Sequence, residues 1–144
     1  MILYSTEHKS PNVSLEEAIF RGLPPDNGLY MPTSIQPLPA SFFETIQDRS
    51  LPEIAIAVCE NLLGDSLSSA DIKKIIDQSM TFEAPIVSLE PGVEVLELFH
   101  GPSMAFKDFG ARFMAAIMSH YLVKSKREIR ILVATSGDTG GAVA

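Results

Sequence analysis

The sequence predicts an α/β protein, in which a mainly helical domain over residues 1–80 precedes the start of an α/β domain over residues 81–144. Three observations indicate this class. Apolar residues recur at helical spacing in several segments before residue 80, whereas runs rich in Ile and Val, which are typical of strands, concentrate after it. A glycine-rich turn follows the last of these runs, as in the strand-to-helix connections of α/β proteins.

Composition excludes several classes of protein. With 46% hydrophobic and 20% charged residues, the 144-residue chain has the balance of a globular protein. The formal net charge of -7 gives no support for binding to nucleic acids or anionic membranes. The N-terminus lacks a signal-peptide pattern, and no apolar run approaches the ~20 residues that span a bilayer. We therefore expect a cytoplasmic protein. Its single cysteine, Cys59, has apolar neighbours and is interpreted as a small buried helix residue.

Capping and turn residues define the first elements. Residues 2–6 have strand composition, and Ser14 precedes Glu17 by the three residues of a helix capping box. The helix that follows should end at Gly22, because glycine terminates helices and two prolines come shortly after it. Leu29–Pro32, beyond an Asp-Asn-Gly turn, is expected to return apolar groups to the core.

The rest of the first 80 residues also reads as helical. Residues 33–40 form a proline-rich connector, and Phe42 lies in a short helix after it. A longer helix should begin after Ser50, with a proline in its first turn, and end at Gly64. Ser68 opens a further helix. No cluster of His, Cys, Asp or Glu has metal-ligand spacing, so no metal site is expected.

After residue 80 the pattern changes to that of an α/β unit. Residues 85–89 and 93–99 are predicted strands joined by a turn at 90–92. A helix is predicted over about 108–124, and a buried strand over 129–134. This order predicts a parallel crossover, and the glycine turn after it opens another helix. By its pattern alone, this turn can be an anion-binding helix N-terminus or a plain α/β connection.

Lys107 is the strongest candidate for chemistry. It follows a Gly-Pro turn and stands between Phe106 and Phe109 at the head of a helix. Apolar shielding disfavours the ammonium form and lowers the pKa of a lysine, which leaves an amine able to attack a carbonyl. Lysines near helix starts are nevertheless mostly solvated surface residues, so spacing alone leaves both interpretations open.

Three segments resemble the threonine synthases, pyridoxal 5'-phosphate (PLP)-dependent lyases with the tryptophan-synthase-β-like fold (fold type II). They are HGPSMAFKDFG at 100–110, GLPPDNGLYMP at 22–32 and ATSGDTGGA at 134–142. The resemblance implies that residues 1–80 form the N-terminal domain of such an enzyme. It further implies that residues 81–144 begin an incomplete PLP-binding domain, so that the chain is a truncated N-terminal fragment expected to be inactive by itself.

The same resemblance assigns site residues and a reaction. It implies that Lys107 holds PLP covalently and then serves as general base, with Phe106 and Ser103 beside the cofactor. It also implies a set of contacts to the substrate carboxylate: Thr135, Ser136, Gly137, Asp138 and Thr139. The implied reaction converts O-phospho-L-homoserine and water to L-threonine and phosphate in threonine biosynthesis.

The residues themselves allow simpler roles. Ser103 and Asp138 can cap helices, while Phe106 can be a core residue. Asp108 and Arg112 are four residues apart, so they can form an ion pair on the helix surface. His100 is interpreted as a turn residue whose ring is hydrogen-bonded. The segment at 22–32 is interpreted as a structural turn.

Two other functions stay open. One is a different fold type II enzyme, such as a serine or threonine dehydratase, although Asp138 and the segment at 22–32 favour threonine synthase. The other is a non-catalytic folding or interaction module without cofactor. The chain ends at Ala144, within an expected helix, and we expect the sheet edge left open there to promote self-association through residues 129–144.

Overall fold

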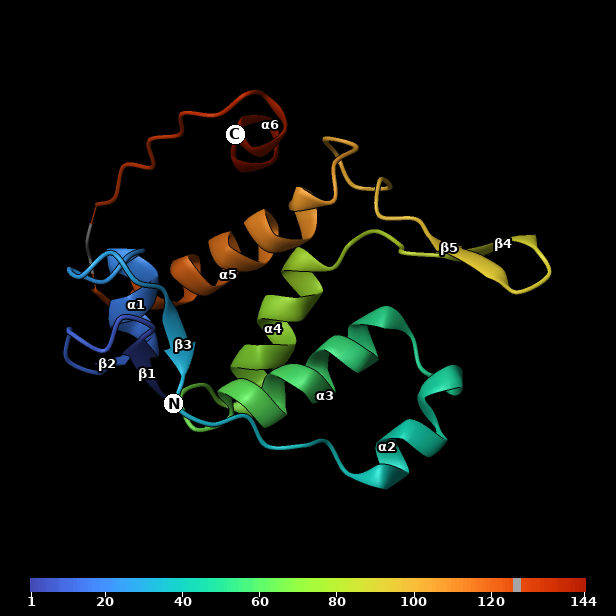
Figure 1. Cartoon of the computed structure of the whole chain (residues 1–144), viewed down its shortest axis with the longest axis horizontal. Helices are drawn as coiled ribbons and strands as arrows, with labels where there is room; N and C mark the ends of the chain where they lie inside the picture. Colours follow the sequence, from blue (N-terminus) through green and yellow to red (C-terminus); the bar gives the residue numbers. More distant parts are fainter. Residues whose placement is uncertain (126–127) are drawn as a thin grey trace. The chain divides into compact units, whose positions relative to one another are not determined.

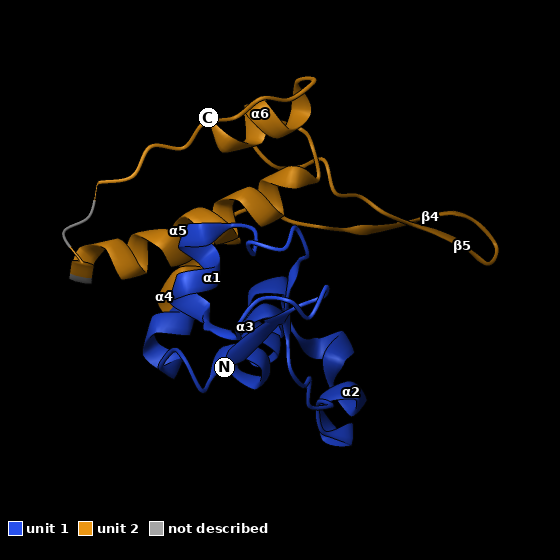
Figure 2. Cartoon of the chain, turned by 60° about the vertical axis from the view of Figure 1, so that its left-hand side comes forward, with its two compact units in different colours: residues 1–73 blue, residues 74–144 orange. Residues whose placement is uncertain are grey.

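The computed structural model describes residues 1–125 and 128–144, and Figure 1 gives the order of their helices and strands. The chain divides into two compact units, residues 1–73 and 74–144 (Figure 2). It contains both helices and strands, so the predicted mixed α/β class is confirmed. No helix within the described ranges has both the length and the apolar character needed to cross a bilayer.

Unit 1 begins with a small antiparallel sheet in the order β2-β1-β3. Its strands are β1 (Ile2–Ser5), β2 (Val13–Ser14) and β3 (Tyr30–Pro32). The sequence predicts β1 alone, because strands of two and three residues carry no periodicity of their own. Helix α1 (Leu15–Arg21) follows β2 directly, and its inward residues Leu15 and Ala18 are buried.

The predicted capping box at the start of α1 is half formed. Ser14 Oγ accepts a hydrogen bond from the Glu17 N–H at 3.2 Å, as predicted. The carboxylate of Glu17 pairs instead with Arg21 at 2.6 Å, since these side chains lie one turn apart on the same helix face. The helix ends at Gly22, which has the positive φ of 76° that favours glycine.

Asp26 organises the turn between α1 and β3. Its carboxylate accepts hydrogen bonds from Ser5 Oγ at 2.6 Å, the Lys9 N–H at 3.0 Å and the Gly28 N–H at 3.1 Å. A Cβ on Gly28 would lie 3.0 Å from the Glu7 nitrogen, so this close approach needs glycine. These contacts give residues 24–28 a structural role, as their composition predicts.

The core prediction for Leu29–Pro32, the segment that follows this turn, is wrong at two of its four positions. Leu29 and Met31 are exposed, because β3 is an edge strand with few neighbours on that side.

Four helical segments complete the first half of the chain. They are α2 (Ala40–Glu44), the 3-10 helix η1 (Ile46–Asp48), α3 (Leu51–Leu63) and α4 (Ser69–Ser79), which continues into unit 2. Ser50 and Glu53 form a full reciprocal capping box at the start of α3, and Gly64 ends this helix as predicted. Cys59 lies on α3, where burial raises the pKa of its thiol, in agreement with a structural role.

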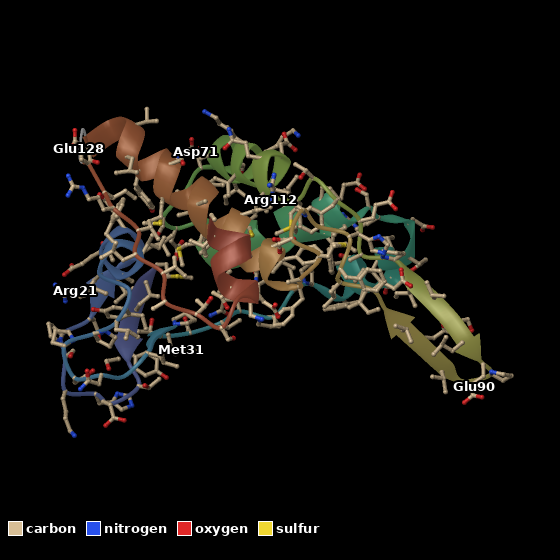
Figure 3. The ribbon with its side chains drawn as sticks, turned by 90° about the horizontal axis from the view of Figure 1, so that it is seen from above. Arg21, Met31, Asp71, Glu90, Arg112 and Glu128 are labelled. Carbon is tan, nitrogen blue, oxygen red and sulfur yellow. The ribbon has the colours of Figure 1, made fainter. Side chains whose placement is uncertain are left out.

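After the end of α4, the described residues of unit 2 form a β-hairpin and two helices. Strands β4 (Ile86–Glu90) and β5 (Val93–Leu96) pair antiparallel around Gly92, whose φ is 83°. Helix α5 spans Lys107–Ser125 and α6 spans Asp138–Val143. The hairpin extends away from both helices in two views (Figures 1 and 2), and Glu90 marks its tip in Figure 3. Its apolar residues Ile86, Leu89 and Leu96 are exposed.

The buried strand predicted at residues 129–134 is wrong. These residues have no regular secondary structure, and Ile131, Leu132 and Val133 are exposed. A strand requires a neighbouring backbone, and the two strands that the structure describes in this unit pair with each other. The predicted parallel crossover is therefore absent from the described residues, whereas the glycine turn after this segment does open a helix, α6.

Candidate functional site

Lys107 is the first residue of α5 and follows a tight loop at residues 101–106. The Met104 N–H donates to the Gly101 carbonyl at 3.0 Å, which closes a turn in this loop. Met104 has a φ of 56°, in the left-handed region. The lysine is thus presented by a compact turn at the very start of a helix.

The Lys107 side chain lies against two groups. Its Nζ is 3.7 Å from Asp138 Oδ2 and 4.6 Å from the centre of the Phe106 ring. The lysine side chain is 32% exposed and that of Asp138 is 77% exposed, so the pair is open to solvent. Phe106 is 61% exposed, which makes the core prediction for this residue wrong. The ring of Phe109 packs on that of Phe82, with ring centres 4.6 Å apart.

The turn before α6 is capped by Thr135. Its Oγ1 accepts hydrogen bonds from the Gly137 N–H at 3.1 Å and the Gly140 N–H at 3.0 Å. Asp138 makes no side-chain cap, which corrects the capping prediction: its carboxylate faces Lys107 instead. Ser136, Gly137 and Thr139 are exposed on the same turn.

Ser103 contributes hydrogen bonds to a buried carboxylate. Its N–H donates to Asp108 Oδ2 at 2.9 Å, and its hydroxyl donates to Asp108 Oδ1 at 2.6 Å. The prediction that Ser103 caps α5 is wrong, since the serine is the donor in both bonds. A Cβ on Gly141 would lie 3.9 Å from Ser103 Cβ, so α6 packs beside this loop.

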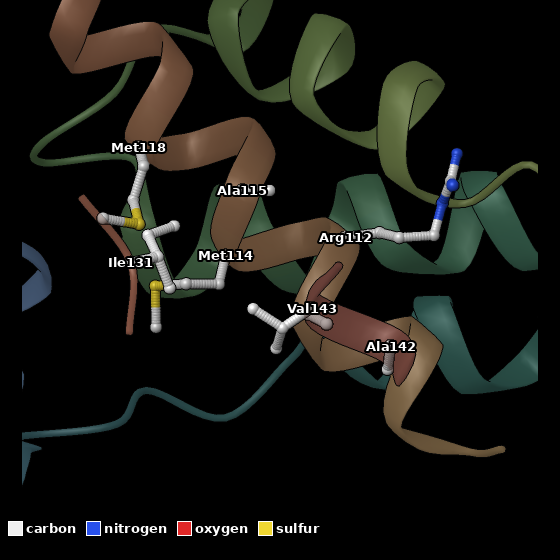
Figure 4. Close-up of a pocket in the computed structure, with 8 residues that line it drawn as sticks. Arg112, Met114, Ala115, Met118, Ile131, Ala142 and Val143 are labelled. Atoms are coloured by element: carbon white, nitrogen blue, oxygen red, sulfur yellow. The ribbon is translucent and has the colours of Figure 1, made fainter. Parts of the chain in front are cut away.

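The predicted surface ion pair between Asp108 and Arg112 is also wrong. Asp108 is buried, and Arg112 reaches α4 instead (Figure 4). Arg112 donates to the carbonyls of Ser79 at 3.3 Å and Gln78 at 3.4 Å, and to Thr81 Oγ1 at 3.2 Å. Carbonyls at a helix C-terminus attract a cation, and this attraction outweighs a solvated pair on the helix face.

His100 has the role that its sequence context predicts. Its Nε2 lies 2.7 Å from Glu97 Oε2, and its ring stacks on Phe99 with centres 4.7 Å apart. Within the residues that the structure describes, no group of His, Cys, Asp and Glu could hold a metal ion.

A mainly apolar cleft of about 370 Å³ lies between α5 and α6 (Figure 4). Lys107 does not line it, so the cleft is separate from the amine. The lining residues, mostly small or flexible apolar side chains, are Ala111, Arg112, Met114, Ala115, Met118, Ile131, Ala142 and Val143.

The groups around Lys107 fit the attachment of an aldehyde cofactor. Attachment requires an amine that solvent can reach, and Lys107 meets this condition, with the exposed carboxylate of Asp138 as its ionic partner. The exposed ring of Phe106 offers a flat apolar face beside the amine. Ser136 and Thr139, which carry hydroxyl groups, are exposed on the adjoining turn.

Comparisons with known proteins all lead to one family. The family model described as "Threonine synthase N terminus" matches residues 3–80. Threonine synthase of Schizosaccharomyces pombe is 40% identical to this chain over 152 residues, covering 96% of the chain and 30% of the relative. That of Haemophilus influenzae is 38% identical, covering 100% of the chain and 33% of the relative.

Two solved structures are similar over almost the whole chain. PLP-bound threonine synthase from Brucella melitensis matches with a TM-score of 0.91 and 34% identity, covering 99% of this chain and 32% of that one. Threonine synthase from Escherichia coli matches with a TM-score of 0.90 and 33% identity, covering 100% of this chain and 33% of that one. The chain thus spans about a third of the length of these relatives.

Proposed function

Since this chain belongs to the family of threonine synthase N-terminal regions, we propose that it forms the part of such an enzyme that carries the cofactor lysine, Lys107. The proposed reaction of the whole protein converts O-phospho-L-homoserine and water to L-threonine and phosphate. The PLP-bound relative from Brucella melitensis supports PLP as the cofactor. The proposed fold is type II, with residues 1–80 as an N-terminal domain and residues 81–144 as the first part of the PLP-binding domain.

The observation that carries this proposal is the meeting of Lys107 with Asp138. The two residues come from separate segments, 100–110 and 134–142, that resemble threonine synthase motifs. Their side chains approach within 3.7 Å. A lysine beside a turn with exposed hydroxyl residues is what a cofactor amine next to a substrate-carboxylate site requires.

Lys107 has two roles in the proposed mechanism. It holds PLP covalently, and its amine, when free, takes the α-proton of the substrate as a general base. PLP supplies the electron sink for the charge that proton removal leaves on the substrate. The Asp138 carboxylate stabilises the lysine ammonium once the proton has been taken up. The ring of Phe106 keeps water from one side of the amine.

The turn before α6 binds the substrate carboxylate in this proposal. Ser136 and Thr139 donate through exposed hydroxyls, and Gly137 lets the carboxylate approach the backbone closely. Thr135 holds the turn in shape by accepting N–H groups from within it. The hydroxyl hydrogen of Ser103 is already donated to Asp108, so Ser103 can offer the cofactor only its oxygen lone pairs.

Two further proposals concern the molecule in the cell. We place it in the cytoplasm, and we propose self-association through residues 129–144. The basis for self-association is now the exposed apolar side chains of Ile131 and Leu132, since the strand edge first expected there is absent.

The test of the proposed function is selective labelling by PLP. The chain is incubated with PLP, reduced with borohydride and digested, and the modified lysines are identified by mass spectrometry. We expect Lys107 to be modified well above the exposed Lys74 of α4, and this excess to disappear in Lys107→Ala. The matched control, Lys74→Ala, should leave the labelling of Lys107 unchanged. Equal labelling of the two lysines in the unsubstituted chain would contradict the proposal.

A second measurement separates threonine synthase from dehydratase chemistry. In a whole enzyme that contains these residues, O-phospho-L-homoserine should yield phosphate and threonine in equal amounts. Formation of 2-oxobutyrate from threonine, or of pyruvate from serine, without phosphate release, would instead favour a dehydratase.

A further inference from the structure

Asp108 is a buried carboxylate that the proposed chemistry does not use. It is 2% exposed, and it accepts the N–H and the O–H of Ser103 at 2.9 and 2.6 Å. A buried carboxylate is tolerated only where donors replace the water it has lost. Both donors here come from one residue, five positions earlier, so the carboxylate ties the loop at 101–106 to the first turn of α5.

The shape of this loop depends on that tie. A Cβ on Gly101 would lie 2.8 Å from Asp108 Cβ and 2.9 Å from Asp108 Cγ, so only glycine fits beside the carboxylate. Met104 is held in the left-handed region at a φ of 56°. A non-glycine residue stays in that region only where its surroundings hold it there.

Asp108 also directly follows Lys107 on α5. Its oxygens are engaged by Ser103, while the lysine Nζ lies near Asp138 and the Phe106 ring. The carboxylate therefore acts on the lysine through the backbone that the two residues share. Reactions of a fixed amine are sensitive to such positioning, because a shift of about 1 Å can slow a reaction by about 100-fold.

We propose that Asp108 is a positioning residue, whose buried carboxylate fixes the 101–106 loop and the first turn of α5 and so aims the amine of Lys107 toward Asp138. The further step, that this orientation of the amine serves reaction with a cofactor aldehyde, rests on the proposed function. The geometry assigns Ser103 to the same unit, as the donor of both hydrogen bonds.

The experiment compares the reactivity of Lys107 with that of Lys74 in the same molecule, using two reagents. One is PLP with borohydride, and the other is formaldehyde with cyanoborohydride, which methylates any accessible amine without a cofactor site. In Asp108→Ala we expect the Lys107-to-Lys74 ratio to fall about tenfold for PLP. For methylation we expect this ratio to rise, because the released amine gains access to solvent.

Matched variants separate positioning from loss of the fold. Ser103→Ala removes one donor and should move both ratios in the same directions as Asp108→Ala. Ser103→Thr keeps the N–H and the hydroxyl and should restore the original ratios. Asp65→Asn removes an exposed carboxylate elsewhere and should leave both ratios unchanged. Circular dichroism shows whether each variant is folded. If Asp108→Ala is unfolded, Asp108→Asn is used in its place, because it keeps the size of the side chain.

The outcomes are distinct. The positioning role would be overturned if the Asp108→Ala and Ser103→Ala variants are folded and keep the original Lys107-to-Lys74 ratio for both reagents. A methylation ratio that depends on Asp108, in a chain whose Lys107 shows no preference for PLP, would support positioning and count against the proposed function. Failure of Ser103→Thr to restore either ratio would also overturn the proposal.

Discussion

At the scale of single residues, Asp26 shows how local contacts set the charge of a side chain. Partial burial acts to raise its pKa, but hydrogen bonds from Ser5, Gly28, Ser10 and Lys9 outweigh it and lower the pKa from 3.8 to about 2. A carboxylate with a lowered pKa stabilises the folded chain above its ordinary pKa, and this stabilisation is lost as the pH falls through the lower value.

Asp26→Asn should therefore change the acid sensitivity of the protein. We expect the Tm of the unsubstituted chain to fall between about pH 4 and pH 2 more steeply than that of the variant, because only the carboxylate must take up a proton. Thermal unfolding followed by circular dichroism at several pH values measures this difference. Asp65→Asn, at an exposed position, should keep the original steepness. Parallel curves for the chain and Asp26→Asn would refute this explanation.

The half-buried Asp26 and the buried Asp108 show which side-chain roles could be predicted from sequence. The turn role of Asp26 is local, since Asp-Asn-Gly is turn chemistry in almost any context. Asp108 was predicted to lie on the surface because its spacing from Arg112 fits a helix-face pair. Its burial depends on the close approach of Gly101, and no local pattern reveals such an approach. The contact of Lys107 with Asp138 is likewise a result of folding, although both residues were singled out in advance.

At the scale of elements, the helices and three of the strands followed their signals: β1, β4 and β5 lie close to the predicted segments 2–6, 85–89 and 93–99. Helices α3 and α5 begin and end close to the predicted residues, because caps and apolar spacing are contained within each segment. Strands β2 and β3 were missed, and the segment at 129–134 was wrongly predicted as a strand. Whether a segment becomes a strand depends on a second segment that pairs with it, and this second segment can lie anywhere in the chain.

The link between α5 and the end of α4 gives a prediction at this scale. Arg112→Ala should lower the free energy of unfolding by about 1–2 kcal/mol, because two α4 carbonyls lose a charged donor. Arg112→Lys should recover part of this loss, since an ammonium group cannot span the same acceptors as a guanidinium. Urea unfolding measures the difference. The exposed Arg130, replaced by Ala, serves as control, and an equal loss there would exclude a specific role for Arg112.

At the scale of the whole molecule, the exposed apolar residues of unit 2 are its most unusual feature. They include the hairpin residues Ile86, Leu89 and Leu96 and the segment around Leu132, which is 93% exposed. Exposed apolar side chains of this kind are available to bury against another molecule. Removal of this surface from water is the driving force of the self-association proposed above.

Leu132→Asp should therefore weaken self-association without affecting the fold, because the position is almost fully exposed in the chain. Burying a leucine at an interface contributes about 1.5 kcal/mol or more, so the dissociation constant should rise at least about tenfold. Sedimentation velocity over a range of concentrations measures this constant. Leu23→Asp, at another exposed leucine, is the matched control and should leave it unchanged. If the unsubstituted chain sediments as a monomer at every concentration, or if both variants weaken association equally, residues 129–144 do not form the interface.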